Sequence, residues 1–170
     1  LEKNESSDGN NLPKLLTAEH EKLLDNSKTS DEMFHAMKKI LSNYNSSNVK
    51  HLQQILMIAI KKGFIDVVSS LSQIGLDFNF EHNEDTPLSL AMKQDKLNFG
   101  IIELILNNGF NPNFKRTNTN TSIMQDLYEI LIRDDVGNKE DYFKALNLFI
   151  NYGANIYYQN FLKFWEENSE

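Results

Sequence analysis

The sequence predicts an all-α protein built as a helical-repeat solenoid. Apolar residues recur at i, i+3 and i+4 spacing through most of the chain, which is typical of amphipathic helices. Glycines suited to closing a helix stand at positions 75, 109 and 153, so they lie 34 and 44 residues apart. A recurring distance of this size between helix ends indicates stacked helical repeats.

The stretch Thr86–Ala91 (TPLSLA) gives the clearest start of a repeat. Thr86 can cap the first turn of a helix, and Pro87 suits the first helical position because its missing N–H would have no partner there. Leu88, Leu90 and Ala91 then form a small apolar face. A second helix is predicted from Phe99 to Asn107, and Gly109 closes it.

The segment before the repeats is predicted to form a flexible lead-in and a helical cap. Residues 1–11 are polar and offer almost nothing to bury, so we expect no packed structure there. Residues 12–47 carry two apolar periodic runs, the first from Leu12 to about Asp25. The second follows Thr29 and Glu32, which have the spacing of a capping box. Without repeat features of their own, these two helices are expected to cover the open end of the array.

Three repeats are predicted over residues 48–157, with boundaries at 48–82, 83–117 and 118–157. The first has helices from Asn48 to Gly63 and from Ile65 to Gln73, with Ile65 and Ile74 counted among its apolar residues. The third contains a polar insertion at Arg133–Lys139, which accounts for most of its extra length. Residues 158–170 contain Phe161, Leu162, Phe164 and Trp165, and are expected to form a C-terminal cap helix.

The three copies of the pattern G-[LFA]-[DN], extended to G-x-[DN]-x-N in the first two, resemble the ankyrin-repeat family. TPLSLA is similar to the T-P-L-H-x-A pattern of that family, whose period is about 33 residues. The resemblance implies an ankyrin-like solenoid of about three degenerate repeats. Ser89 stands at the family's histidine position, which removes a side-chain hydrogen bond that often ties neighbouring turns together.

The family resemblance implies a non-catalytic module that binds a partner protein on its concave surface. The two loops that project between repeats differ in charge, the first being acidic around Glu81 and the second basic around Arg116. Aromatic and arginine side chains are frequent interface hot spots, so we expect the partner contacts to be concentrated there and at the nearby inner-helix ends. The predicted contacts are Phe80, Glu81, His82, Phe114, Lys115, Arg116, Lys61, Lys62, Lys93 and Gln94. The alternative is that these loops are solvated turns without a partner.

Composition argues against several other classes of function. The net charge of −7 disfavours a general nucleic-acid-binding surface. The chain has no cysteine, which excludes disulfides and thiolate chemistry, and its longest apolar run is too short to span a bilayer. The four histidines lack metal-site spacing, and the calcium-loop-like stretch from Asp77 has His82 where glycine is needed. We therefore expect no catalytic residues, no metal and no cofactor.

Asparagine- and lysine-rich composition is similar to that of secreted effectors of intracellular bacteria, which act on host proteins. We expect a monomer in the cytoplasm, or one released into a host cytosol by a non-classical route. Two alternatives stay open. The chain begins with Leu1, so it can be an excised accessory domain that recruits substrates for a larger enzyme, or it can be a structural module that spaces or dimerises larger chains.

Overall fold

The computed structural model describes residues 16–42, 48–133, 135–156 and 166. Within these residues the prediction of an all-α protein is confirmed. The described chain forms eight α-helices, and its only β-type pairing is an isolated antiparallel bridge between His82 and Asp85. None of the described helices is long and apolar enough to cross a membrane.

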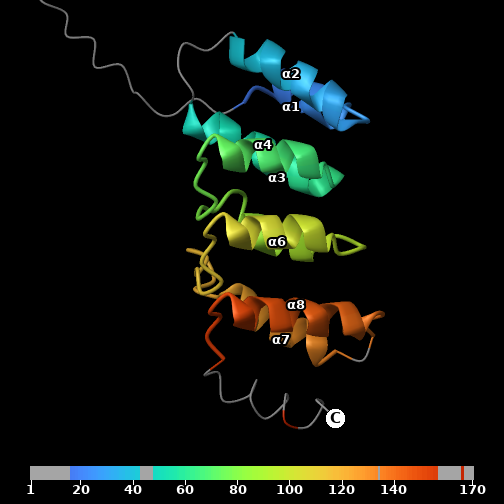
Figure 1. Ribbon diagram of the computed structural model, residues 1–170, viewed down its shortest axis with the longest axis vertical. Helices are drawn as coiled ribbons and strands as arrows, with labels where there is room; N and C mark the ends of the chain where they lie inside the picture. The colour runs from blue at the N-terminus through green and yellow to red at the C-terminus, as the bar shows by residue number, and fades with distance from the viewer. Residues whose placement is uncertain (1–15, 43–47, 134, 157–165, 167–170) are drawn as a thin grey trace, which may run out of the picture.

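The helices are connected as successive antiparallel pairs. In chain order they are α1 (Ala18–Asp25), α2 (Ser30–Ser42), α3 (Val49–Lys62), α4 (Ile65–Gln73), α5 (Pro87–Met92), α6 (Phe99–Asn107), α7 (Ile123–Leu131) and α8 (Lys139–Asn151). Turns connect the two helices of a pair at one edge of the molecule, and the long loops that follow α4 and α6 connect successive pairs at the opposite edge (Figure 1).

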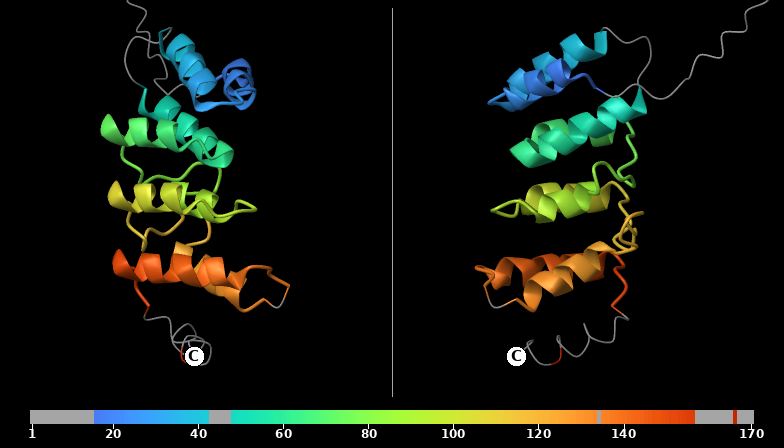
Figure 2. Two further views of the ribbon diagram at one scale, coloured as in Figure 1. Left: turned by 45° about the vertical axis from the view of Figure 1, so that its right-hand side comes forward. Right: turned by 180° about the vertical axis from the view of Figure 1, so that it is seen from behind.

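The four pairs stack along the long axis of the molecule (Figures 1 and 2). The helices α1, α3, α5 and α7 form one row, in which each packs on the next, and α2, α4 and α6 pack in order in the other row. The fourth pair continues the second row through α8, where the Lys144 ammonium lies 4.3 Å from the centre of the Phe99 ring of α6. The result is an elongated array in which each described pair packs on its neighbours.

One continuous hydrophobic core runs through the array from Leu16 to Ala154. Its largest fully buried side chains include Phe78, in the loop that follows α4, and Phe149, in α8. The helix α5 is buried on all sides, because every residue from Pro87 to Met92 is buried. A short helix without an exposed face occurs only where neighbours cover it completely.

Helix ends follow the local chemistry closely in the central pairs. Gly63, Gly75, Gly109 and Gly153 all have positive φ, the left-handed geometry that glycine adopts at helix ends. Thr86 caps α5 as predicted, and its hydroxyl accepts a hydrogen bond from the Ser89 N–H at 3.0 Å.

Two predictions about the first helices need correction. The first helix begins only at Ala18, because Thr17 caps it by accepting a hydrogen bond from the His20 N–H at 3.2 Å. In the second, the Thr29 hydroxyl accepts from the Glu32 N–H at 3.2 Å, as a capping box requires. However, the Glu32 carboxylate reaches the N–H of Lys28, at 2.7 Å, and not that of Thr29.

Two apolar residues of the first predicted repeat, Ile65 and Ile74, lie outside the core. Ile74 is 64% exposed because it follows the last turn of α4, and Ile65 is 38% exposed at the first residue of that helix. Ile65 nevertheless lies close to the next pair, at the first turn of α6. A β-carbon at Gly100 in the first turn of α6 would lie 2.8 Å from the Ile65 Cδ1, so glycine there leaves room for the isoleucine.

Asparagine side chains connect the long loops into a ladder of hydrogen bonds. We call residues 74–86 the first finger and residues 108–122 the second finger. The Asn79 side chain donates to the Gly109 carbonyl at 3.1 Å and accepts from the Asn111 N–H at 2.7 Å. Asn113 repeats this arrangement one pair later, with the Gly153 carbonyl at 2.9 Å and the Asn155 N–H at 2.6 Å.

The ladder explains the spacing of the G-x-[DN]-x-N pattern. The side chains of Asp77 and Asn111 accept hydrogen bonds from the N–H groups two residues later, each at 2.9 Å, and these Asx turns orient Asn79 and Asn113. The glycine carbonyl of one copy accepts a hydrogen bond from the last asparagine of the copy before it. Each copy of the pattern therefore binds the next copy through backbone groups.

We expect Asn113→Ala to lower the free energy of unfolding by about 1–2 kcal/mol, because two hydrogen bonds between neighbouring pairs are lost at once. Urea unfolding followed by circular dichroism at 222 nm measures the change. Asn151→Ala is the matched control, since Asn151 is an exposed asparagine at the end of α8, outside the ladder. Equal stability of the Asn113 variant and the wild type would show that the ladder contributes nothing.

The predicted lead-in at residues 1–11 and the predicted cap helix at residues 158–170 lie outside the described residues, apart from Glu166. The predicted N-terminal cap corresponds to α1 and α2. The Gln54 side chain of α3 joins this cap to the repeats. It donates a hydrogen bond to the Glu21 carboxylate at 3.2 Å and accepts one from the Leu16 N–H at 2.8 Å.

Candidate protein-binding cleft

A cleft of about 280 Å³ lies between α5 and α7, beside the second finger. We call it the α5–α7 cleft. Its apolar lining comes from two successive helices of the same row, and its charged lining comes from their ends and from the second finger. The lining residues are Ser89, Met92, Lys93, Arg116, Ile123, Asp126, Leu127, Glu129, Ile130 and Arg133.

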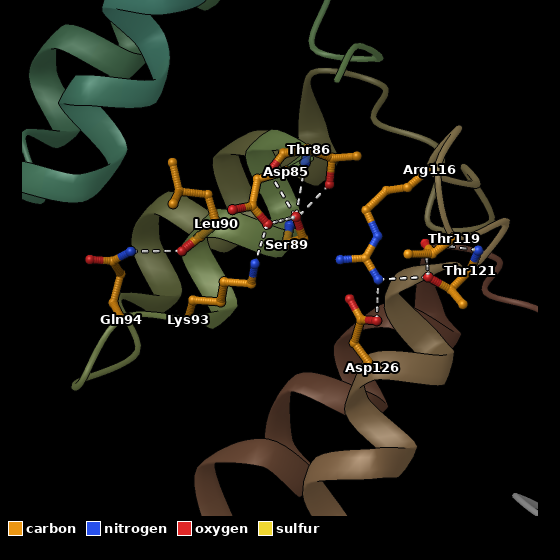
Figure 3. Close-up of polar contacts among 10 residues, drawn as sticks. All are labelled: Asp85, Thr86, Ser89, Leu90, Lys93, Gln94, Arg116, Thr119, Thr121 and Asp126. Atoms are coloured by element: carbon orange, nitrogen blue, oxygen red, sulfur yellow. Dashed lines mark hydrogen bonds and ion pairs between the residues drawn. The ribbon is translucent and has the colours of Figure 1, made fainter. Parts of the chain in front are cut away.

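On the α5 side, the polar groups are already paired with one another (Figure 3). The Ser89 hydroxyl donates to the Asp85 carboxylate at 2.8 Å and accepts from the Thr86 N–H at 2.8 Å. The Lys93 ammonium lies 2.6 Å from the same Asp85 oxygen. Ser89 thus completes a capping box at the position where the ankyrin pattern has histidine, and Asp85 holds Lys93 at the rim of the cleft.

On the opposite side, an ion pair joins the second finger to α7 (Figure 3). The Arg116 guanidinium pairs with the Asp126 carboxylate and also donates to the Thr121 hydroxyl at 2.6 Å. The side chains of Arg116 and Asp126 are only 13% and 22% exposed. This pair fixes the base of the second finger against the first turn of α7.

The pKa of Asp126 is raised by its burial, although Arg116 lowers it through charge and hydrogen bonding. Glu129, one turn further along α7, raises the pKa of Asp126 as well. Burial disfavours the ionised form of a carboxyl group and a nearby cation favours it. The net shift is upward, so the cost of burying the Asp126 carboxylate exceeds the stabilisation that Arg116 and Lys93 give to its ionised form.

At the far rim, Arg133 is paired with Asp135 in the connection between α7 and α8. The Arg133 guanidinium donates to both oxygens of the carboxylate, at 3.0 and 2.8 Å. The pKa of Arg133 is raised and that of Asp135 is lowered by this hydrogen-bonded contact. Both side chains are well exposed, so the pair positions the Arg133 head group and adds little to stability.

The first finger contributes less free surface than the sequence suggests. Phe80 is 7% exposed and belongs to the core, so it is not available as a partner contact. The Glu81 carboxylate accepts from the Thr117 N–H at 2.7 Å and thereby joins the two fingers. His82 pairs with Asp85 through the backbone. Partial burial lowers the pKa of His82, with Glu21 opposing the shift and two lysines adding to it.

The second finger contains both structural and exposed residues. Phe114 is half-buried against the core, and its ring centre lies 6.1 Å from that of Phe110. Arg116 is held by Asp126, as described above. Lys115 is exposed and is the one predicted contact of this finger that extends into solvent.

The predicted lysine and glutamine contacts do not form a single surface with the fingers. Lys61, Lys62 and Gln94 line a separate, shallow groove of about 570 Å³ at the helix-turn edge. The Lys62 ammonium lies 5.6 Å from the centre of the Phe64 ring, and the Gln94 side chain donates to the Leu90 carbonyl at 2.7 Å. Of the ten predicted contacts, only Lys93 and Arg116 line the α5–α7 cleft.

Four polar residues of the cleft were not predicted from the sequence: Ser89, Asp126, Glu129 and Arg133. Asp126 and Glu129 are three residues apart and therefore share one face of α7, and Arg133 follows the end of that helix. That spacing was available in the sequence. It could have indicated a charged face on α7, but the sequence does not show that this face borders a cleft.

Within the described part of the chain, no group of three or more histidine, aspartate or glutamate side chains is arranged to hold a metal ion. The chemistry of the cleft is that of preformed ion pairs around an apolar floor. In comparisons with known proteins, no protein-family model, no curated protein and no solved structure matches this chain.

Proposed function

We propose that the chain is a non-catalytic protein-interaction module, built as a degenerate ankyrin-like solenoid, that binds a segment of a partner protein in the α5–α7 cleft. Lys115 on the second finger extends the contact beyond the cleft. The observation that carries this proposal is a cleft between two successive helices of one row, with an apolar floor and polar walls that are already paired.

Three features support an ankyrin-like architecture. The helices are antiparallel pairs closed by left-handed glycines, the Thr86–Pro87 start caps an inner helix, and long loops at one edge join successive pairs. The asparagine ladder adds a regular contact between these loops. Such arrays bind partners along the surface that their stacked repeats create.

Preorganisation supports binding at the cleft. A rim in which Lys93 and Arg116 already have carboxylate partners loses little side-chain freedom when a partner arrives, which reduces the cost of association. The apolar floor of Met92, Leu127 and Ile130 gives a partner side chain an area to bury. Most binding energy in such interfaces comes from a few buried anchors.

The test is capture by the immobilised chain, with Ile130→Trp as the variant that fills the cleft without changing its charge. The composition resembles that of effectors acting on host proteins, so a eukaryotic cell lysate is the first one to use. We expect Ile130→Trp to reduce capture of a specific partner about tenfold or more, since about 1.4 kcal/mol corresponds to each tenfold change.

Leu104→Trp is the matched control, because Leu104 is also half-exposed but lies on α6 in the other row. Circular dichroism and thermal unfolding verify that both variants fold. Equal capture by the wild type and Ile130→Trp would overturn the proposed function at this cleft.

A further inference from the structure

The shallow groove at the helix-turn edge is basic, although the chain as a whole is acidic. It lies where the turn between α3 and α4 is next to the turn between α5 and α6 (Figure 1). We call it the turn-edge groove, and it is lined by residues 60–63 and 94–99. Its charged lining residues are Asp95 and three lysines, Lys61, Lys62 and Lys96. The lining therefore carries a net charge of +2, on a chain whose net charge is −7.

The three lysines of the turn-edge groove have no carboxylate partner among the described residues. The ion pairs within that part of the chain involve other cations, namely Lys93, Arg116 and Arg133. Those three cations line the α5–α7 cleft, where each is already paired with an aspartate. A carboxylate that enters the turn-edge groove therefore displaces no internal ion pair.

Aromatic rings hold two ammonium groups at the groove without neutralising them. The Lys62 ammonium lies 5.6 Å from the centre of the Phe64 ring. The Lys144 ammonium of α8 lies 4.3 Å from the centre of the Phe99 ring, and Phe99 lines the groove. A cation over an aromatic face is attracted by the ring quadrupole and keeps its full charge. Lys62 is thus restrained in position, and Lys144 adds a fourth cation beside the groove.

The helix ends at the groove modify this charge. Lys61 and Lys62 are in the last turn of α3, whose negative end offsets part of their charge. On the opposite wall Lys96 and Asp95 balance each other, but α6 begins there at Phe99, after the cap Asn98. The first N–H groups of a helix have no acceptor within it and carry partial positive charge. Both walls are therefore net positive.

We propose that the turn-edge groove binds an acidic segment of the partner protein, with its carboxylates at Lys61, Lys62 and Lys96. The buried Ile60 and Leu97 form an apolar floor for the stems of these acidic side chains. This assignment rests on the proposed function, because it gives the proposed partner a second contact. The two sites adjoin along the chain, since Lys93 lines the α5–α7 cleft and the next residue, Gln94, lines the groove.

A short acidic segment fits the charge distribution better than a nucleic acid does. Nucleic-acid binding depends on many phosphate contacts, and a long polyanion would meet the net charge of −7 beyond the groove. A peptide with a few carboxylates needs only the local cations. The groove volume of about 570 Å³ is within the range of roughly 300–1,000 Å³ that is typical of sites for small ligands.

The experiment is a two-dimensional ¹H–¹⁵N NMR titration of the full chain with an acetylated and amidated tetraglutamate peptide. We expect saturable shifts of backbone amides in residues 61–64 and 94–101. These shifts should largely disappear at about 1 M NaCl, where the screening length is about 3 Å. The matched tetraglutamine peptide has the same backbone without the charges and should not shift these amides. Shifts of equal size with tetraglutamine, no saturable shifts with tetraglutamate, or tighter binding of a four-nucleotide oligothymidylate would each overturn the proposal.

The double variant Lys62→Gln with Lys96→Gln removes one cation from each wall of the groove. We expect tetraglutamate binding to weaken roughly three- to tenfold, as for the loss of two ion pairs near the surface. Lys38→Gln with Lys50→Gln is the matched control, because it makes the same change in net charge at exposed lysines outside the groove. Equal weakening in the two double variants would mean that net charge, and not the groove, attracts the peptide, and the proposal would be wrong.

The two proposals fail separately. If Ile130→Trp reduces partner capture while tetraglutamate causes no saturable shift, the proposed function stands and the acidic-segment assignment is wrong. If Ile130→Trp leaves capture unchanged while tetraglutamate binds at the turn-edge groove, the α5–α7 cleft is not the partner site and the groove remains an acidic-segment site.

Discussion

Leu90→Asp is expected to abolish cooperative unfolding of the chain and most of its helical signal at 25 °C. Leu90 is 6% exposed in α5, a helix whose six residues are all buried. A carboxylate at this position has no cation beside it in the core, and burying an uncompensated charge costs several kcal/mol. That cost is comparable to the whole stability of a typical domain, about 5–15 kcal/mol.

The position of α5 in the array makes this effect global. Each pair of helices is stabilised mainly by its neighbours, so disrupting the third pair separates the first two pairs from the last one. Arrays of this kind need about three adjacent repeats for stability. Neither fragment is then expected to keep its structure.

Circular dichroism at 222 nm during urea unfolding measures the result. Leu90→Met is the control, because it conserves volume and apolar character and should cost less than about 1.5 kcal/mol. A Leu90→Asp protein that unfolds cooperatively near the wild-type urea midpoint would contradict the buried position of this helix.

Arg116→Met is expected to lower the free energy of unfolding by about 1–3 kcal/mol at pH 7. This lies between the small effect of removing an exposed ion pair and the 3–5 kcal/mol of a fully buried one. The reason is that Asp126 remains half-buried after its cation is removed. The Thr121 hydroxyl loses its guanidinium donor as well.

The destabilisation should depend on pH. Burial already raises the pKa of Asp126 above its usual value of 3.8, and removing Arg116 raises it further. When the pKa of a carboxyl group is higher in the folded state than in the unfolded state, the free energy of unfolding falls as the pH rises through the folded-state pKa, because the ionised group is less stable in the fold. The difference between the wild type and Arg116→Met should therefore be largest at pH 7 and shrink as the pH is lowered to about 4.

Arg133→Met is the matched control, because it makes the same substitution in an ion pair whose side chains are 61% and 69% exposed. Its effect at pH 7 should be within about 1 kcal/mol of zero. Urea unfolding of the three proteins at pH 7 and pH 4 provides the comparison. A destabilisation by Arg116→Met that is the same at both pH values would mean that Asp126 is not the responsible group.

Local chemistry explains why much of the fold could be predicted. A threonine–proline start, a glycine at a helix end and an Asx turn each act within a few residues, so Thr86 and Gly109 indicated helix boundaries from the sequence alone. Periodic apolar residues identified the helices for the same reason. Exposed Ile74 shows the limit of this approach, because its position after the last turn of α4 decided its exposure.

The candidate site was harder to predict because it depends on contacts between elements. Phe80 has the sequence context of a projecting loop, but packing against the core buries it. Arg116 was predicted as a free contact, and its partner Asp126 lies ten residues away on the next helix. Which charges are paired follows only from the arrangement in space.

The asparagine ladder also has a mechanical consequence. Hydrogen bonds join successive loops at one edge of the stack, so the spacing between helix pairs can vary least at that edge. We expect the variation to be largest at the opposite edge, where Lys93 and Arg133 line the cleft. A ligand that draws these two residues closer would shorten that edge alone, and the elongated array would become more strongly curved.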